Sequence, residues 1–309
     1  MTERFNGLVV RSTGSWYEVR TDDGTVRECR IRGKLRLKGV RSTNPVVVGD
    51  VVECEVDATG ECIIVDITPR RNYIIRRASN LSKESHIIAA NLDQAALVVS
   101  LFAPRTAYEF VDRFLVTCEA YGIPVTILLN KVDLARQTPE ALEEFVATYT
   151  VAGYKVLEVS ATEGIGIERL RKLLVGKTTL LSGNSGVGKS SLINAIDPSI
   201  NTRTGEVSSS HHKGMHTTTF SQMYPLEEGG YIIDSPGIKG FGLLDIESDE
   251  LARYFPDFMR FAPECGFYNC THTHEPKCAI VQAVEEWKIM PSRYESYLKI
   301  LEEDNKYRK

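Results

Sequence analysis

The sequence predicts a multidomain fold with three consecutive units: an N-terminal OB-like β-barrel, a central α/β domain and a mostly helical C-terminal domain. Residues 1–72 contain short strand-like runs separated by turn residues, and residues 73–245 alternate strand-like with helix-like segments. Residues 246–309 hold a cluster of cysteine and histidine, followed by one charged helix from Ala279 onward. A chain of 309 residues is long enough for two or three such domains.

The composition is that of a folded protein. Hydrophobic residues make up 42% of the chain, and 37 basic against 41 acidic side chains give a net charge of −4. This balance argues against disorder and against a uniformly basic surface, although it allows a local basic patch. The first 16 residues lack the apolar run of a secretory signal, and no stretch approaches ~18 consecutive apolar residues. We expect a cytoplasmic protein with no membrane partner, and we predict a monomer.

In the first unit, turn residues separate the strand-like runs and no segment has helical periodicity. Asp23-Gly24, Gly49-Asp50 and Thr59-Gly60 are the turn signals. This pattern predicts a small OB-like barrel, and an SH3-like barrel fits nearly as well. The predicted strands are Gly7–Val10, Trp16–Arg20, Val46–Val56 and Cys62–Ile67.

The second unit has apolar runs between segments of helical spacing, which predicts a parallel sheet covered on both faces. One helix should begin after Thr138, a capping residue followed by a first-turn proline. The ligands of such a sheet lie at the carboxyl ends of its strands. The predicted strands are Ala95–Leu101, Val125–Leu129 and Val156–Val159, and the predicted helices are Tyr108–Tyr121 and Glu140–Ala152.

A glycine-rich motif in this unit predicts a phosphate-binding loop. The strand-like run Lys177–Ser182 leads into Gly183–Ser190, which matches G-x-x-x-x-G-K-[ST] and precedes a helical pattern at Ser191–Ile196. Glycines let backbone N–H groups surround phosphate oxygens, the lysine supplies a charge and the serine hydroxyl binds Mg²⁺. A chance glycine-rich turn is the alternative. The predicted nucleotide-binding residues are Gly183, Asn184, Ser185, Gly186, Val187, Gly188, Lys189, Ser190 and Ser191.

A second motif, Asn130-Lys131-Val132-Asp133, predicts that the base is guanine. It directly follows the strand Val125–Leu129, and an aspartate carboxylate can accept two hydrogen bonds from guanine. Asn130 can hold the loop, and the stem of Lys131 can cover the ring. Ser160 and Ala161, after the next strand, can offer a backbone N–H to the guanine carbonyl. The alternative for the tetrapeptide is a solvated turn.

Two further segments predict contacts to the terminal phosphate and Mg²⁺. Asp234-Ser235-Pro236-Gly237 ends the run Tyr231–Ile233 and matches D-x-x-G, in which Asp234 approaches Mg²⁺ through water and Gly237 meets the γ-phosphate. From Thr217–Thr219 we select Thr218 as a Mg²⁺ ligand beside Ser190, although this triplet also reads as the start of a polar strand. The base motif precedes the phosphate loop, which reverses the order of ordinary small GTPases and indicates a circularly permuted P-loop GTPase domain.

The third unit contains a metal-binding pattern. Cys265, Cys270 and Cys278 lie close together with His272 and His274 between them. Three thiolates and one imidazole suit tetrahedral Zn²⁺, and a full set of four protein ligands indicates a structural role. Free cysteines in a packed core are the alternative. The spacing alone leaves both histidines as candidates.

Basic residues gather in the first unit between Arg27 and Arg41, where seven basic residues and one acid give a local charge of +6. Five of them recur at every second position, so an extended strand would place them on one face. Such a face suits contact with a phosphate backbone, and a solvated strand face is the alternative. The five are Arg30, Arg32, Lys34, Arg36 and Lys38, and Arg70, Arg71, Arg76 and Arg77 extend the surface.

The permuted motif order, the flanking barrel and the Cys/His cluster together resemble the ribosome small-subunit-dependent GTPase A (RsgA) family over essentially the whole chain. The resemblance implies GTP hydrolysis to GDP and phosphate, stimulated by the small ribosomal subunit, in late maturation of that subunit. It also implies ribosomal RNA as a partner, Mg²⁺ with GTP, and one structural Zn²⁺ held by Cys265, Cys270, His272 and Cys278. His272 is preferred to His274 because it matches the family pattern.

The predicted catalytic residues are Lys189, Thr218 and His216. Ile238 follows Gly237 where many GTPases have a water-orienting glutamine, and an aliphatic side chain cannot take that role. His216, with His211 and His212 nearby, is therefore the candidate that positions water. Two other functions fit parts of the pattern: a P-loop ATPase or kinase, and an RNA-binding scaffold whose nucleotide domain is inactive.

Overall fold

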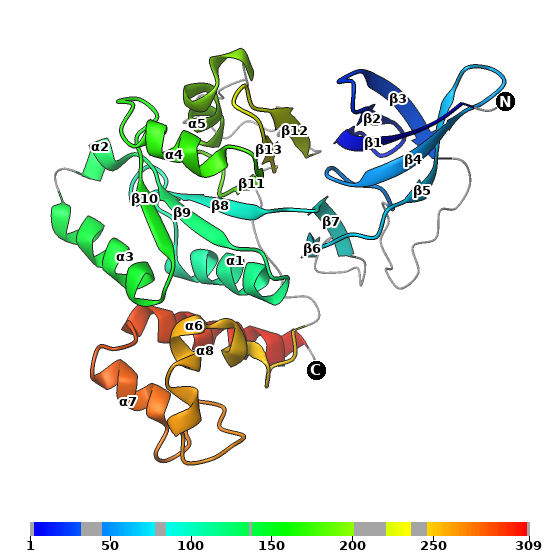
Figure 1. Ribbon diagram of the computed structural model, residues 1–309. Coiled ribbons are helices and arrows are strands. Elements are labelled where there is room, and N and C mark those ends of the chain that lie inside the picture. Colours follow the sequence, from blue (N-terminus) through cyan, green and yellow to red (C-terminus); the bar gives the residue numbers. More distant parts are fainter. Residues whose placement is uncertain are drawn as a thin grey trace.

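The computed structural model describes residues 3–31, 45–77, 85–135, 138–200, 221–235 and 246–307. A central α/β domain lies between a β-barrel and a helical C-terminal unit (Figure 1). The predicted fold class is therefore confirmed. Most of the basic segment lies outside the described residues, and so do Thr218, His216 and Gly237.

The N-terminal unit is a closed β-barrel, as predicted, and it has five strands. Its strands are β1 (Glu3–Ser12), β2 (Tyr17–Arg20), β3 (Val26–Ile31), β4 (Val51–Val56) and β5 (Cys62–Ile67). They pair in the order β1-β2-β3-β5-β4, and β4 pairs back with β1, which is the closed order of an OB-like barrel. Buried apolar side chains, including Val9, Val19 and Ile64, fill its interior.

The predicted strand Val46–Val56 is wrong in its first half, because β4 begins only at Val51. Gly49 has a φ of 91°, and a Cβ there would lie 2.1 Å from the carbonyl oxygen of Ala90. A turn at Gly49-Asp50 therefore brings the barrel against the chain that enters the central domain. Strand β3 had not been predicted as a separate element.

The central sheet has the order β10-β9-β8-β11-β13-β12. All neighbouring pairs from β10 to β13 are parallel, whereas β12, the last strand of this domain, is antiparallel to β13 and pairs on its other side with β1 of the barrel. The strands are β8 (Gln94–Val99), β9 (Val125–Leu129), β10 (Lys155–Glu158), β11 (Thr178–Ser182), β12 (Gln222–Pro225) and β13 (Tyr231–Asp234).

Helices cover both faces of this sheet, as the alternating pattern predicted. Along β8, Leu97 belongs to the core that contains α1 and α3, and Val98 belongs to the core that contains α4 and α5. This alternation buries the strand on both sides. The helices are α1 (Tyr108–Ala120), α2 (Val132–Ala135), α3 (Pro139–Val151), α4 (Ile167–Leu174), α5 (Lys189–Ile196) and the short η1 (Pro198–Ile200).

Two local predictions in this region were incomplete. Pro139 starts α3 as predicted, but the Thr138 side chain makes no capping hydrogen bond. The strands β6 (Tyr73–Arg77) and β7 (Ser85–Ala90) form a separate two-stranded sheet that had not been predicted. This sheet joins the barrel to β8 (Figure 1).

The C-terminal unit is mostly helical and has its own apolar core. The single charged helix predicted from Ala279 is in fact two helices, α7 (Ala279–Glu285) and α8 (Pro291–Tyr307). The chain turns between them at Trp287, whose φ is 58°, and Pro291 begins the second helix. The shorter elements are η2 (Leu251–Tyr254), α6 (Pro256–Met259) and η3 (Ala262–Glu264).

A buried ion triad joins the C-terminal unit to the central domain. Arg293 of α8 donates to Asp112 of α1 at 2.6 Å and to both carboxylate oxygens of Asp257 in α6 at 2.7 and 3.1 Å. Burial opposes the charge on Arg293, but Asp112 and Asp257 outweigh it and raise its pKa well above the ordinary value. Breaking such a pair leaves buried charge without a partner, so the triad fixes α8 against α1.

Within the part of the chain that the structure describes, none of the helices has both the length and the apolar character needed to cross a membrane. The longest of them, α8, carries acidic and basic side chains along its length, as its sequence PSRYESYLKILEEDNKY shows. Its apolar residues pack instead into the core of the C-terminal unit, where Tyr297 and Ile300 are buried.

Candidate functional site

The predicted phosphate loop connects β11 to α5 at the carboxyl end of the central sheet. Its backbone needs glycine at two crowded positions. A Cβ at Gly183, whose φ is 150°, would lie 2.3 Å from the carbonyl oxygen of Val98, and a Cβ at Gly188 would lie 2.4 Å from Asn130 Nδ2. The loop thus fits closely between two neighbouring strand ends, and α5 begins directly after it.

Lys189, the first residue of α5, is directed into the loop. Its Nζ donates to the carbonyl oxygens of Gly183 at 2.8 Å and Asn184 at 2.9 Å. Burial lowers the pKa of this ammonium, while the charge of Asp234 opposes that change. Phosphate oxygens can replace the two carbonyl oxygens as acceptors at little cost, because the ammonium is already partly desolvated.

Asp234 ends β13 beside this lysine. Its Oδ1 is buried and finds no hydrogen-bond partner among the described residues. Burial raises the pKa of Asp234 to about 6, and the Lys189 ammonium opposes the rise. An unpartnered carboxylate oxygen next to a phosphate loop fits a hydrated Mg²⁺, because a metal-bound water would supply the missing donor. Ser190, the second residue of α5, is the other described Mg²⁺ candidate.

The predicted base loop is tied to the phosphate loop by two side chains. Asn130 Nδ2 donates to the carbonyl oxygen of Val187 at 2.8 Å. Lys131, which has a φ of 63°, donates through Nζ to the carbonyl oxygen of Gly186 at 2.8 Å and to that of Ala103. The contact to Ala103 had not been predicted, and no sequence motif indicated it.

Ser160 and Ala161 lie against the same base loop. The Ser160 hydroxyl donates to Asp133 Oδ1 at 2.6 Å, and the Ala161 N–H points to Asn130 Oδ1 at 3.4 Å. The structure therefore brings Asn130, Asp133, Ser160 and Ala161 together beside the phosphate loop. It adds a feature that the sequence did not indicate, since the Ser160 side chain orients the carboxylate of Asp133.

Some predicted residues lie outside the described residues: Thr218 and its neighbours, the histidines His211, His212 and His216, and Gly237 with Ile238. The same is true of Arg32, Lys34, Arg36 and Lys38 in the basic segment. Arg30, at its described end, places its guanidinium 3.7 Å from the ring centroid of Trp16. This stacked pair joins β3, which contains Arg30, to the β1–β2 turn, which contains Trp16.

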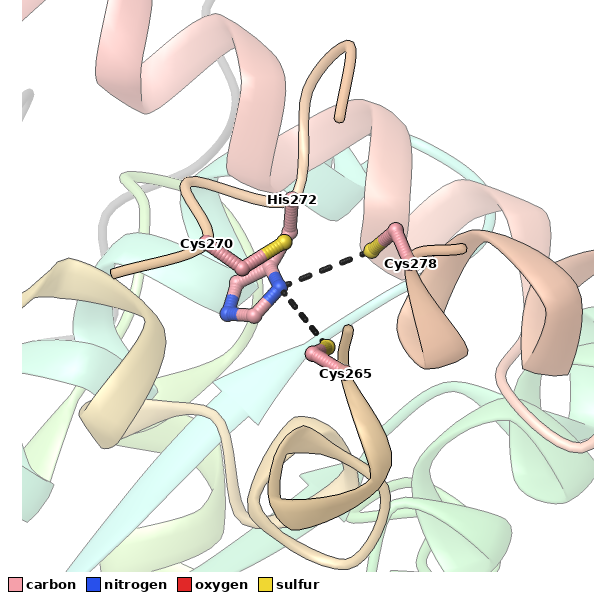
Figure 2. A group of neighbouring side chains, drawn as sticks. All are labelled: Cys265, Cys270, His272 and Cys278. Carbon is pink, nitrogen blue, oxygen red and sulfur yellow. Dashed lines mark hydrogen bonds between the residues drawn. The ribbon is translucent and has the colours of Figure 1, made fainter. Parts of the chain in front are cut away.

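The C-terminal unit brings together three cysteines and one histidine (Figure 2). The ligand atoms of Cys265, Cys270, His272 and Cys278 all lie within 4.8 Å of one another. His272 Nδ1 is 3.7 Å from Cys265 Sγ and 3.6 Å from Cys278 Sγ. His274 is not part of this group, and its Nδ1 contacts the Thr273 hydroxyl at 2.8 Å.

This donor set fits a soft divalent cation. Burial raises the pKa of the Cys270 thiol to about 12, so a cation is needed to favour the thiolate there. Two tyrosines of α8 hold the loop in place, because Tyr294 donates to the carbonyl oxygen of His272 at 2.7 Å and Tyr297 to that of Thr271 at 2.8 Å. Neither tyrosine was predicted from the sequence, although their spacing of three residues places them on one helix face.

These observations define a class of protein. A phosphate loop, an adjoining N-K-x-D loop and a strand ending in aspartate lie at one edge of a P-loop sheet, in a chain where the N-K-x-D loop comes first. The protein is a circularly permuted P-loop GTPase with a flanking barrel and a Cys₃His unit.

Comparison with known proteins gives the family. Residues 67–244 match the model of the RsgA GTPase, and residues 6–64 match that of the RsgA N-terminal domain. The curated small ribosomal subunit biogenesis GTPase RsgA 2 of Bacteroides thetaiotaomicron is 54% identical over 305 residues, which is 98% of each chain. RsgA of Porphyromonas gingivalis is 54% identical over 97% of each chain. The chain belongs to the RsgA family and is a GTP hydrolase.

Two solved structures are similar over nearly the full length. The crystal structure of YjeQ from Thermotoga maritima has a TM-score of 0.77 and 34% identity, covering 97% of this chain and 98% of that one. The structure of YloQ, described as a circularly permuted GTPase, has a TM-score of 0.73 and 29% identity, covering 99% and 96%. The permuted domain is therefore shared with proteins of solved structure.

Proposed function

We propose that this GTPase hydrolyses GTP to GDP and phosphate in the biogenesis of the small ribosomal subunit, and that the subunit stimulates the reaction. The names of its relatives support the biological role. The observation that carries the chemistry is the buried Asp234 carboxylate beside Lys189, whose Oδ1 has no hydrogen-bond partner among the described residues. The phosphate loop that leads into Lys189 is in turn joined to the N-K-x-D segment.

In this proposal Gly183–Ser191 surround the phosphates, and Lys189 exchanges two carbonyl acceptors for phosphate oxygens. Asp133, oriented by Ser160, accepts the two hydrogen bonds that guanine offers. Ser190, Thr218 and Asp234 would hold Mg²⁺, which neutralises charge on the phosphates when bound. Asn130 and Ala161 complete the base site.

The hydrolytic step needs a group that orients water, and Ile238 cannot provide it. We assign this role to His216, with Thr218 closing the site from the same segment and Gly237 meeting the γ-phosphate. Lys189 stabilises the charge that develops on the transferred phosphoryl group. Basal turnover should be slow, because the histidine must be brought into place by the partner.

The C-terminal unit, residues 246–309, is proposed to hold one structural Zn²⁺ through Cys265, Cys270, His272 and Cys278. Four protein ligands leave no open position for a substrate, so the ion would stabilise the unit. Residues 73–245 would form the GTPase domain and residues 1–72 the RNA-binding barrel.

Ribosomal RNA is the proposed partner of the barrel. The basic segment from Arg27 to Arg41 supplies the charge, and Arg30 stacked on Trp16 adds a planar surface on which a base can lie. We further propose that the protein acts in the cytoplasm as a monomer.

The decisive experiment measures phosphate release from GTP with and without purified small ribosomal subunits. We expect subunits to raise the rate by at least tenfold and Lys189→Ala to abolish the increase. Equal rates with and without subunits would refute the proposed stimulation. Phosphate release from ATP as fast as from GTP would support the rival P-loop ATPase, and binding of subunits without any turnover would support the RNA-binding scaffold.

A further inference from the structure

Strand β1 of the barrel contributes side chains to two different cores. Val9 is fully buried in the barrel interior together with Tyr17, Val19 and Ile64. Its neighbour Val10 is 7% exposed and belongs instead to the core of the central domain, which also contains Met223 and Ile233. One barrel strand is therefore also a packing element of the GTPase domain.

A β-bulge produces this change of direction. Val9 pairs with Val19 of β2 and Arg11 pairs with Glu18, so Val10 is the extra residue without an opposite partner. A bulge bends its strand and re-aims the side chain of the inserted residue. Here it turns Val10 toward the central domain while Val9 stays in the barrel.

Beyond the bulge, β1 joins the central sheet. Arg11 pairs antiparallel with Gln222 of β12, and on the other side of β12 the same Gln222 pairs with Asp234 of β13. The antiparallel register places Val10 beside Met223, and both residues lie in one core. The barrel is thus two strands away from the carboxylate proposed to approach Mg²⁺ (Figure 1).

The electrostatics of β12 agree with this arrangement. Burial raises the pKa of Tyr224 on β12, the charge of Asp234 raises it further, and Arg11 of the barrel opposes both. The Tyr224 side chain is therefore close enough to Asp234 and to Arg11 for both charges to change its pKa.

We infer that Val10 is a positioning residue of the nucleotide site: it holds β12, through Met223, in register with β13 and so fixes Asp234. The regulatory part of this inference rests on the proposed function: when the barrel shifts on binding RNA, this arrangement would transmit the shift to the nucleotide site and so regulate the GTPase. β12 is the outermost strand that the central domain contributes to the sheet, and β1 pairs with it on the outer side. A change of register or twist at this joint therefore reaches Asp234 through one intervening strand.

The full-length chain offers a matched pair of variants for the test. Val10→Ala removes the side chain that enters the GTPase core, and Val9→Ala removes the same number of atoms from the barrel core. Binding of a fluorescent, non-hydrolysable GTP analogue is measured with and without Mg²⁺. Val10→Ala should reduce the gain in affinity that Mg²⁺ provides by about three- to tenfold. The affinity of Val10→Ala for GDP without Mg²⁺ should differ from that of the wild type by less than twofold. The variant Val10→Ile, in contrast, should retain the wild-type Mg²⁺ effect.

The control separates positioning from loss of stability. Both alanine variants should lower the Tm, but Val9→Ala should keep the wild-type Mg²⁺ effect. An unchanged Mg²⁺ effect in Val10→Ala, or an equal loss in both variants, would overturn the inference. This measurement uses no ribosomes, so it still decides the inference if small subunits fail to stimulate hydrolysis and the proposed ribosomal function is rejected. If small subunits do stimulate hydrolysis, Val10→Ala should lower the kcat of the stimulated reaction and leave the KM for subunits unchanged.

Discussion

Asp234 should destabilise the protein when no nucleotide or Mg²⁺ is bound. Its carboxylate is mostly buried, and Oδ1 has no hydrogen-bond partner among the described residues. Burial raises its pKa from the ordinary 3.8 to about 6, against the attraction of Lys189. Replacing Asp234 with asparagine keeps the shape and removes the charge. We therefore expect Asp234→Asn to be more stable than the wild type at alkaline pH.

The magnitude follows from the pKa. Above pH 6 the carboxylate is ionised in both the folded and the unfolded chain, and the rise from 3.8 to about 6 corresponds to about 3 kcal/mol of lost folding stability. At pH 5 the folded protein has mostly taken up the proton while the unfolded chain is still ionised, which leaves about 1.5 kcal/mol of that cost, and well below pH 3.8 none is left. The stabilisation by Asp234→Asn should shrink accordingly as the pH falls.

Urea denaturation of the nucleotide-free protein at pH 8 and pH 5, without Mg²⁺, measures both values. Other groups that titrate in this pH range contribute equally to the free energies of unfolding of variant and wild type, so their contributions cancel in the difference. Asp249→Asn, at an exposed aspartate, is the control and should change the free energy of unfolding by less than ~0.5 kcal/mol. The reasoning would be refuted if Asp234→Asn gave no stabilisation at pH 8, or the same stabilisation at both pH values.

Three further predictions concern other parts of the molecule. Arg293→Ala should lower the free energy of unfolding, measured with denaturant, by about 3–5 kcal/mol because it leaves two buried carboxylates unpaired. The control Arg253→Ala, at an exposed arginine, should lower it by under ~1 kcal/mol. Equally small losses in both variants would contradict the role of the triad. Cys270→Ser should lower the zinc content of the purified protein and make residues 246–309 sensitive to protease, and Cys118→Ala should keep full zinc; a zinc-free but protease-resistant wild type would argue against a structural ion. Asp133→Asn should weaken GTP binding by at least tenfold and favour xanthosine nucleotides in a competition assay, and unchanged GTP affinity would exclude its role in base recognition.

Much of the central domain could be predicted because local signals there agree with the fold. The strand Val125–Leu129 was predicted with its observed bounds, and α1 differs from its predicted end by one residue. Apolar runs with flanking glycine or asparagine are strong markers in a parallel sheet that is buried on both faces. The sequence of α7 and α8 gave a weaker signal, since the left-handed turn at Trp287 depends on tertiary packing.

The predicted site is a different case, since motifs name residues but not their partners. N-K-x-D indicated Asn130 and Asp133, yet nothing in it shows that Lys131 contacts Ala103 or that Ser160 orients Asp133. Those contacts join segments separated by 28 and 27 residues. Pairings of this kind follow from the sheet order, which a single sequence does not determine.

The two flanking units are attached to different elements of the GTPase domain, and each attachment leads toward the proposed nucleotide site. The barrel reaches Asp234 through β12, and the Cys₃His unit is fixed to α1 by Arg293 and Asp112. Helix α1 follows the loop that contains Ala103, whose carbonyl oxygen accepts a hydrogen bond from Lys131 of the base loop. Because one attachment meets the phosphate side and the other the base side, a partner that contacts both outer units at once can act on the nucleotide from two directions. Loss of either joint should then reduce stimulated turnover more than basal turnover.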